Sequence, residues 1–333
     1  MNVVRGAYLA DLLAQPAAVE ATLAALAVDE KLRAIVDRYG TFRRVLLTGM
    51  GSSLHALHPL AIRLGAMMID ASELIHAQAN LLAPDTLVIS VSQSGRSAEI
   101  VRLVEGPRRP GACIGVTNTS GSPLATKADA VILTHAGEET TVSCKTYVAG
   151  LAALVFLGDA LTNQASDLSE AVPAMRAYLA AWEEHVSEIA SLTSGIRDVC
   201  VAGRGTSLAA AGTAGLILKE STRVHAEGMT SAALRHGPLE MAAEHVFALV
   251  YEGDPAVASL NAALVADLRR AGARAELCGP SAERPAMRLP TVAPDVRPLL
   301  EILPAQMLSL ALAAAKGVEA GVFVHATKVT ATE

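Results

Sequence analysis

The sequence predicts an α/β fold of two doubly wound parallel sheets in tandem, one in each half of the chain. Three observations support this fold class. Apolar residues make up 52% of the 333 residues and charged residues 18%, which is typical of a well-buried globular chain. Short apolar segments alternate with segments of helical spacing, as in strands joined by helices. The pattern of the first half also recurs in the second, which indicates two similar domains.

The recurrence begins at two glycine-containing segments. Val45–Ser53 (VLLTGMGSS) and Val199–Ser207 (VCVAGRGTS) each read as an apolar strand, then Gly-x-Gly-[Ser/Thr]-Ser, then an Ala/Leu-rich helix. Three further pairs follow in the same order: Ala71–Glu73 with Ala226–Glu227, Thr86–Val91 with Val246–Tyr251, and Gly111–Val116 with Gly272–Leu277. We therefore expect each half to fold around its own sheet.

The repeat also places the domains along the chain. Residues 41–163 are the first predicted domain and residues 196–319 the second, with residues 164–195 as one or two linking helices. Residues 1–40 carry leucines at helical spacing and are expected to form helices packed outside the first sheet. Residues 320–333 are the expected C-terminal tail.

A cluster of polar side chains follows one strand of the first half. The apolar segment Thr86–Val91 stops at Ser92-Gln93-Ser94, Gly95 permits a tight turn, and helical spacing restarts after Ser97. Serine hydroxyls beside the free N–H groups and positive dipole end of a helix make an anion site. A neutral cradle of this kind suits the single phosphate of a small metabolite. The plainer interpretation is that these serines are N-cap and turn residues.

The second half carries different residues at the corresponding place. There the strand runs into Tyr251-Glu252-Gly253-Asp254, and carboxylates at that turn would repel a phosphate. We therefore expect the first half to bind the phosphate and the second half to contribute another part of the function.

Several other kinds of function are disfavoured. Gly49–Leu54 lacks the third glycine of a dinucleotide fingerprint, and no Walker sequence with its lysine is present. The formal net charge of −6, with no basic stripe, argues against nucleic acid. The longest apolar stretch, Thr146–Gly158, ends at Asp159 and reads as too short to span a bilayer. Asp11 and Gln15 interrupt what would be the apolar core of a signal peptide.

The cysteines give no sign of a metal site or a disulfide framework. They are scattered, without metal-ligand spacing and without a secretory context: Cys113, Cys144, Cys200 and Cys278. We expect reduced thiols, no metal, no membrane association and a cytoplasmic location.

The second half offers an acid and an imidazole for catalysis. Glu220 falls at the end of a predicted helix, where the dipole disfavours a carboxylate and would raise its pKa, as suits a proton carrier. His236 precedes the rigid turn Gly237-Pro238, which would fix the direction of the ring. Such a pair can open a sugar ring and move a proton between adjacent carbons. The plainer interpretations are an exposed helix-end charge and a capped turn residue.

The order of these motifs resembles the SIS (sugar isomerase) domain family. The matching segments are GMGSS at Gly49–Ser53, SQSGRSAE at Ser92–Glu99, KESTRVHAEG at Lys219–Gly228 and RHGPL at Arg235–Leu239. The chain is most similar to the isomerase half of the glutamine–fructose-6-phosphate amidotransferases. That resemblance implies paired flavodoxin-like domains, no metal or organic cofactor, and a homodimer whose sites are completed by the neighbouring subunit.

The resemblance also assigns roles to residues. Ser52, Ser53, Ser92, Gln93, Ser94 and Ser97 would hold the sugar phosphate and nearby hydroxyls. Glu220 would move a proton between C1 and C2, and His236, reaching in from the partner subunit, would assist ring opening. The backbone near Thr141 and Val142 would line the sugar. The tail would close on the active site, and its Lys328 would form a Schiff base with the ketose; the plainer interpretation is a solvated tail lysine.

One departure from the amidotransferases shapes the expected reaction. Those proteins carry an N-terminal glutaminase domain, whereas this sequence starts with Met1-Asn2-Val3 and reaches its first predicted helices at once. We therefore expect an aldose–ketose isomerase/deaminase that acts directly on an amino-sugar phosphate such as glucosamine 6-phosphate. Two alternatives stay open: a non-catalytic sugar-phosphate-binding regulator, and a synthase subunit that lacks its own glutaminase.

Overall fold

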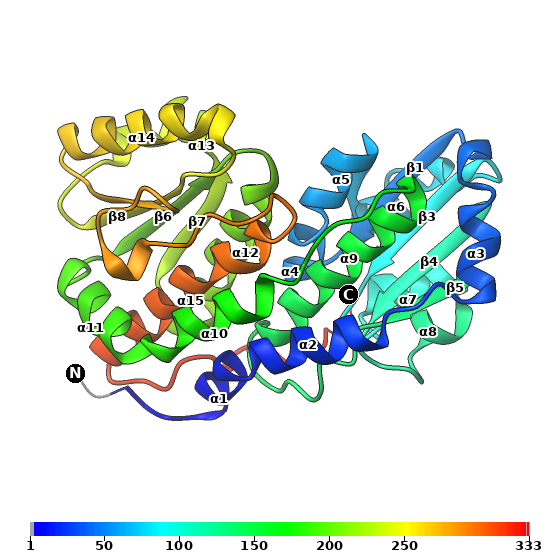
Figure 1. Cartoon of the computed structure of the whole chain (residues 1–333), viewed down its shortest axis with the longest axis horizontal. Helices are drawn as coiled ribbons and strands as arrows, with labels where there is room; N and C mark the ends of the chain where they lie inside the picture. The colour runs from blue at the N-terminus through cyan, green and yellow to red at the C-terminus, as the bar shows by residue number, and fades with distance from the viewer. Residues whose placement is uncertain (1–2, 331, 333) are drawn as a thin grey trace. The chain divides into compact units, whose positions relative to one another are not determined.

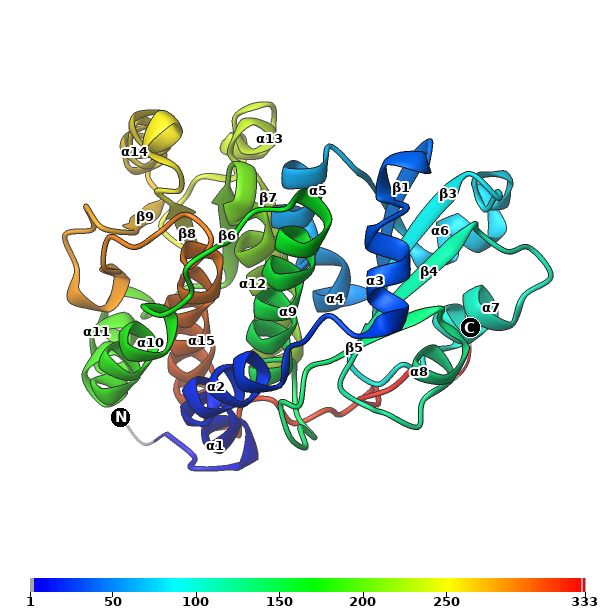
Figure 2. The ribbon, with the colours of Figure 1, turned by 45° about the vertical axis from the view of Figure 1, so that its right-hand side comes forward.

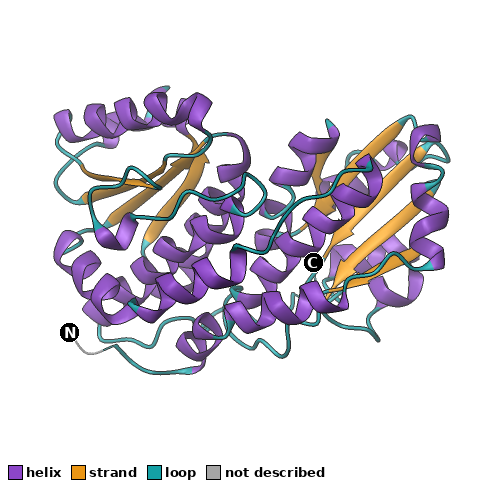
Figure 3. Ribbon diagram, in the orientation of Figure 1, coloured by secondary structure: helices purple, strands orange, loops and turns teal. Residues whose placement is uncertain are grey.

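The computed structural model describes residues 3–330 and residue 332, which divide into two compact units with one parallel sheet each. The first-sheet unit contains Ala17–Glu139, Cys144–Ser166 and the tail from His325. The second-sheet unit contains the chain up to Pro16, Thr140–Ser143 and Asp167–Val324. Figure 3 shows helices on both faces of each sheet, which confirms the α/β class.

The first sheet has the strand order β2-β1-β3-β4-β5, and every neighbouring pair is parallel. Its strands are β1 (Arg44–Gly49), β2 (Met67–Asp70), β3 (Thr86–Val91), β4 (Ala112–Thr117) and β5 (Ala130–Leu133). All residues of β3 and β4 are buried, as expected for central strands covered on both faces. In Figure 2 the strands β1, β3 and β4 can be followed side by side.

Helices cover both faces of this sheet. One face packs against α6 and α7 through a cluster that contains Leu46, Leu74, Val88 and Leu103. The helices that lie in this unit or continue into it are α2 (Gln15–Ala25), α3 (Glu30–Val36), α4 (Gly51–His55), α5 (His58–Leu64), α6 (Ala71–His76), α7 (Ala98–Glu105), α8 (Pro123–Lys127) and α9 (Lys145–Thr162), with single 3-10 turns at Tyr39–Thr41 and Ala79–Leu81.

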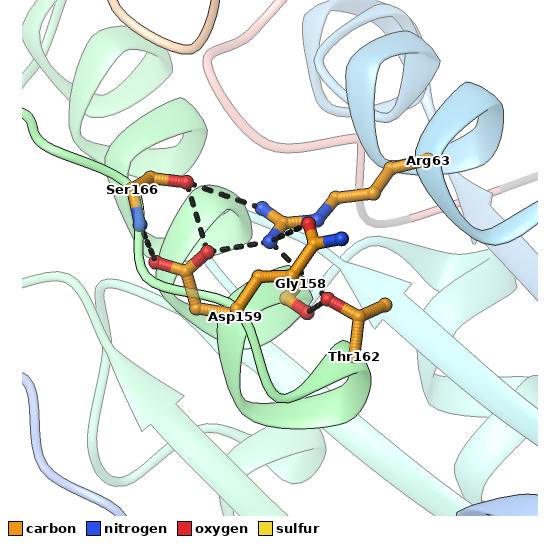
Figure 4. Close-up of polar contacts among 6 residues, drawn as sticks. Arg63, Gly158, Asp159, Thr162 and Ser166 are labelled. Atoms are coloured by element: carbon orange, nitrogen blue, oxygen red, sulfur yellow. Dashed lines mark hydrogen bonds and ion pairs between the residues drawn. The ribbon is translucent and has the colours of Figure 1, made fainter.

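The C-terminal end of α9 is fixed to α5 by a polar cluster, drawn in Figure 4. The Arg63 guanidinium pairs with Asp159 Oδ1 at 2.6 Å and donates to the Thr162 hydroxyl at 3.2 Å. Asp159 in turn accepts from the backbone N–H of Ser166 at 3.0 Å. The cluster holds the last residues of this unit before the chain passes to the other one.

The second sheet has the order β7-β6-β8-β9, again parallel throughout. Its strands are β6 (Asp198–Gly203), β7 (His225–Thr230), β8 (Val246–Tyr251) and β9 (Arg274–Cys278). Figure 1 shows α13 and α14 on one face and α12 and α15 on the other. The helices are α1 (Ala7–Leu13), α10 (Ala171–Ala180), α11 (Trp182–Leu192), α12 (Leu208–Thr222), α13 (Ser231–Arg235), α14 (Pro255–Arg270) and α15 (Arg297–Ala315), with 3-10 turns at Gly205–Ser207, Pro238–Met241 and Pro285–Met287.

The strands correspond between the two sheets, but one predicted pairing of the repeat is wrong. β1, β2, β3 and β4 have the same order as β6, β7, β8 and β9. Ala71 begins helix α6, whereas Ala226 lies inside strand β7. The structural counterparts are the N-cap residues Asp70 and Thr230, which start α6 and α13 after their strands. A single short Ala-Glu match in the sequence was not enough to align the two halves of the chain residue by residue.

The N-terminal helices do not all cover the first sheet. α1 groups with the second-sheet unit, where the Tyr8 hydroxyl lies 3.1 Å from the Ser309 hydroxyl of α15. α3, by contrast, belongs to the first-sheet unit. Leucine spacing shows that a helix has an apolar face, but not which core receives that face.

The apolar stretch after Lys145 is longer than its sequence suggested. It forms an 18-residue helix, so α9, like α15, is long and apolar enough to cross a membrane. The most apolar windows of α9 and α15 are 67% and 89% buried inside the protein. This burial is typical of core helices, so burial rather than length argues against a membrane span.

Candidate functional site

The predicted anion site lies at the carboxyl edge of the first sheet, where β1 and β3 end side by side. From these neighbours the chain proceeds to β2 on one side and β4 on the other, so this is the switch point of the sheet order. Open parallel sheets bind ligands at such points. Gly49 ends β1, and a Cβ on it would approach the Val91 carbonyl oxygen to 2.8 Å. A glycine here lets the two strand ends approach each other.

Residues 92–97, here called the cradle loop, connect β3 to α7. Gly95 has φ +61°, and a side chain on it would overlap the Ser122 hydroxyl. The Gln93 carbonyl accepts from the Asn118 N–H at 3.0 Å and from the Thr117 hydroxyl at 3.2 Å. The Gly95 carbonyl accepts from the Leu124 N–H at 3.2 Å. These bonds to the segment after β4 fix the backbone of the loop before any ligand binds.

The serine hydroxyls of the loop combine two roles. Ser92 Oγ accepts from the Gly95 N–H at 3.1 Å, and Ser94 Oγ accepts from the Arg96 N–H at 3.2 Å. Both are therefore turn residues, as the plainer interpretation held, yet each hydroxyl keeps its own proton to donate. Ser97 occupies the N-cap position of α7, but its side chain makes no capping bond. Ser97 is therefore the N-cap residue that the plainer interpretation predicted, but its hydroxyl does not cap the helix.

Two further predicted phosphate-binding residues follow β1, the strand beside β3 at the switch point. Ser52 and Ser53 lie in the short helix α4, directly after β1, with Ser52 buried and Ser53 partly exposed. The structure thus places all six predicted phosphate-binding residues after two adjacent strands of one sheet.

The tail reaches the start of α7. The Thr330 carbonyl accepts from the N–H of Ala98, the first residue of that helix, at 3.0 Å. In Figure 2 the red tail ends beside α7. The tail thus uses one of the helix-start donors on which the predicted anion site depends.

Lys328 is not a solvated tail lysine. Its ammonium lies 2.7 Å from Glu139 Oε1, and its side chain is 20% exposed whereas that of Glu139 is 0% exposed. Glu139 is not among the site residues predicted from the sequence. A signal for it existed, because Glu139 lies just before a long apolar helix, where carboxylates favour the positive dipole end.

The remaining predicted residues belong to the second-sheet unit. Glu220 is partly exposed in the last turn of α12. His236 is exposed and ends α13, and Gly237 after it has φ +126°, so the predicted turn is present. Thr141 and Val142 are buried, and the Thr141 hydroxyl lies 3.3 Å from Asp11 Oδ2.

At the corresponding place on the second sheet, the polar side chains form hydrogen bonds with one another and with the backbone. The loop between β8 and α14 has three residues, 252–254, whereas the cradle loop has six. Glu252 accepts from the Ser281 N–H at 2.7 Å, and Asp254 caps α14 through the Ala256 N–H. Ser207, the counterpart of Ser53, donates to the buried Glu301 at 2.7 Å. The expected loss of the anion site thus has a second cause besides charge, a shorter and internally bonded loop.

Within 3–330 and 332, no three side chains of His, Cys, Asp or Glu gather closely enough to hold a metal ion.

Known proteins are similar to this chain in sequence and in fold. Residues 42–159 match the SIS domain family. The chain is 28% identical to the glutamine–fructose-6-phosphate aminotransferase (isomerizing) of Thermococcus kodakarensis over 86% of its own length and 52% of that protein's length. The chain therefore spans about half the length of this relative.

Two solved structures share the fold of this chain over nearly its whole length. The C-terminal domain of glucosamine-fructose-6-phosphate aminotransferase from Francisella tularensis superposes with a TM-score of 0.80 at 21% identity, covering 95% of this chain and 98% of that one. Glucosamine-6-phosphate deaminase from Thermotoga maritima gives a TM-score of 0.77 at 17% identity, with 97% and 99% covered. At these identities the structures show a shared fold. The family match covers the first sheet, so an SIS identity for the second sheet stays a prediction. The chain carries an SIS domain over residues 42–159, as its motifs predict.

Proposed function

We propose that this chain is a phosphosugar isomerase/deaminase that converts an amino-sugar phosphate such as glucosamine 6-phosphate to fructose 6-phosphate and ammonia. The observation that carries the proposal is the cradle loop. Its backbone is fixed in advance, its serines can donate to an anion, and it lies at the switch point of an SIS domain. A deaminase with this fold, from Thermotoga maritima, supports the choice of reaction.

The chemistry requires a proton transfer between C1 and C2, a proton exchange between the C2 nitrogen and the C1 oxygen, and one hydrolysis. With the ring open, Glu220 removes the proton from C2 and returns it to C1, while the C1 oxygen gains a proton and the C2 nitrogen loses one. The aldehyde with its neighbouring amine thus becomes a C1 alcohol with an imine at C2. Water then adds to C2, and ammonia leaves. His236 carries the proton between the ring oxygen and the C1 hydroxyl during ring opening, and we propose that it comes from the partner subunit of a homodimer. Lys328 is the proposed amine for an imine with the ketose.

The reverse direction is a second candidate, favoured by the names of the relatives. The Thermococcus kodakarensis relative is an aminotransferase on fructose 6-phosphate. If this chain aminates fructose 6-phosphate, it uses ammonia supplied from elsewhere. Adding ammonium to fructose 6-phosphate and measuring glucosamine 6-phosphate separates the two directions.

Replacing Glu220 tests the proposal directly. Glu220→Gln keeps the shape of the side chain but cannot accept the C2 proton, so release of ammonia and fructose 6-phosphate from glucosamine 6-phosphate should fall at least about a hundredfold. The matched control is Glu244→Gln, an exposed acid of the same unit, which should keep the full rate. Equal rates for wild type and Glu220→Gln on this substrate would remove Glu220 from the mechanism.

A further inference from the structure

Glu139 is a buried carboxylate whose hydrogen-bonding capacity is used by several donors. Oε2 accepts from the backbone N–H groups of Cys144 and Thr146, each at 3.0 Å, and from the Cys144 thiol at 3.3 Å. Oε1 accepts from the Thr146 hydroxyl at 2.6 Å and from the Lys328 ammonium at 2.7 Å. Because α9 starts at Lys145, the carboxylate lies at the N-terminus of an 18-residue helix.

This arrangement keeps Glu139 ionised. Burial alone raises the pKa of a carboxyl group, but the charge of Lys328 and the hydrogen bonds from Lys328 and Thr146 outweigh burial and lower the pKa of Glu139. The helix dipole acts in the same direction. The carboxylate is thus an anion held in one place by the start of α9 and by the tail lysine. The Lys328 ammonium completes the neutralisation of its charge.

The tail has a second point of attachment two residues further on. The Thr330 carbonyl accepts from the Ala98 N–H, beside Ser97 of the cradle loop. Lys328 and Thr330 therefore link one short segment to the start of α9 and to the start of α7, both in the first-sheet unit.

We propose that Glu139 is a positioning residue, the counter-ion that docks the C-terminal tail and so fixes the Lys328 amine at the start of α9 and the Thr330 carbonyl at the start of α7, beside the cradle loop. The use of Lys328 in imine chemistry rests on the proposed function, whereas the docking of the tail does not.

Hydrogen exchange at the Ala98 amide measures docking without any substrate. We expect Glu139→Gln and Lys328→Met to raise the exchange rate of this amide at least about tenfold, because each removes a charge-assisted hydrogen bond. Lys328→Arg keeps the cation and should change the rate less than about threefold. The Val101 amide, which bonds to the Ser97 carbonyl within α7, is the internal reference and should not change.

These variants also separate this inference from the proposed function. Lys328→Arg should keep the tail docked but abolish borohydride trapping of fructose 6-phosphate, since a guanidinium forms no imine. If Ala98 is protected equally in wild type, Glu139→Gln and Lys328→Met, the positioning role is wrong. If docking behaves as expected and wild-type Lys328 is never trapped, only the imine role fails. Should Glu139→Gln not fold, Lys328→Met, which leaves the bonds from Cys144 and Thr146 intact, decides the question.

Discussion

At the scale of single residues, two buried glutamates show how local partners set the pKa of one functional group in opposite directions. Glu139 and Glu301 are both buried glutamates. Glu139 is paired with a cation and lies at a helix N-terminus, so its pKa is lowered. Glu301 lies inside α15, where burial raises its pKa to about 7, against smaller opposing effects of the Ser207 hydrogen bond and the Arg297 charge. Local partners, rather than residue type, decide which form is stable.

Glu301 should make stability depend on pH. Because its folded pKa is raised from 4.5 to about 7, the folded chain keeps a proton that the unfolded chain has lost between those values. Its contribution is therefore full below pH 4.5 and is lost as the pH rises to about 7, by on the order of 2–3 kcal/mol. In Glu301→Gln, chemical denaturation at pH 5 and pH 8 should show a free-energy difference smaller by about that amount. An unchanged difference, matching the exposed control Glu244→Gln, would contradict the assignment.

At the scale of elements, the decisive feature is the length and attachment of the loop after the third strand of each sheet in chain order, β3 and β8. The six-residue cradle loop is bonded to the segment after β4 and leaves hydroxyl groups that can donate. The three-residue loop of the second sheet turns its carboxylates onto its own backbone and onto Ser281. Two copies of one strand-loop-helix element thus differ: one is the proposed anion site, and the other is an internally bonded turn.

Gly95 tests the role of the cradle loop. In Gly95→Ala the methyl group would overlap Ser122 and the residue would keep a left-handed backbone, so the loop must shift. We expect glucosamine 6-phosphate affinity, measured by calorimetry, to fall at least about tenfold. Gly65→Ala is the matched control: φ is +59°, but no atom lies within 4 Å of the added methyl group. Equal loss of affinity in both variants would mean that general destabilisation, and not the cradle, is responsible.

At the scale of the whole molecule, two sheets of the same strand order carry unequal parts of the proposed reaction. The first-sheet unit holds the cradle loop, Glu139 and Lys328, while Glu220 and His236 belong to the second-sheet unit. The relative from Thermococcus kodakarensis is about twice as long, so its full activity is not transferred to this chain.

Ligand binding to the folded chain should stabilise it by mass action. A sugar phosphate present at 100 times its dissociation constant adds about 2.7 kcal/mol to the free energy of unfolding. Thermal unfolding with glucosamine 6-phosphate should therefore shift upward by several degrees, whereas glucosamine without the phosphate should not. No shift with any hexose or hexosamine phosphate would contradict a phosphosugar site.

Much of the fold could be predicted from the sequence because its signals are local. Apolar runs such as Thr86–Val91 and Val246–Tyr251 became buried strands with the predicted bounds, and the six phosphate-binding candidates follow adjacent strands. The hydroxyl-rich loop could be predicted for the same reason, since a strand, a turn and a helix start are neighbours in the chain.

The tertiary structure alone decided which distant groups meet. Glu139 and Lys328 are separated by 189 positions, and Ser207 and Glu301 by 94, so no periodicity links them. The same holds for α1, whose apolar face packs in the second-sheet unit, and for α9, whose burial and not its length makes it a core helix. Sequence fixes which side chains can ionise or bury. Packing fixes whether a charge finds a partner, because burial removes the water that would otherwise solvate it.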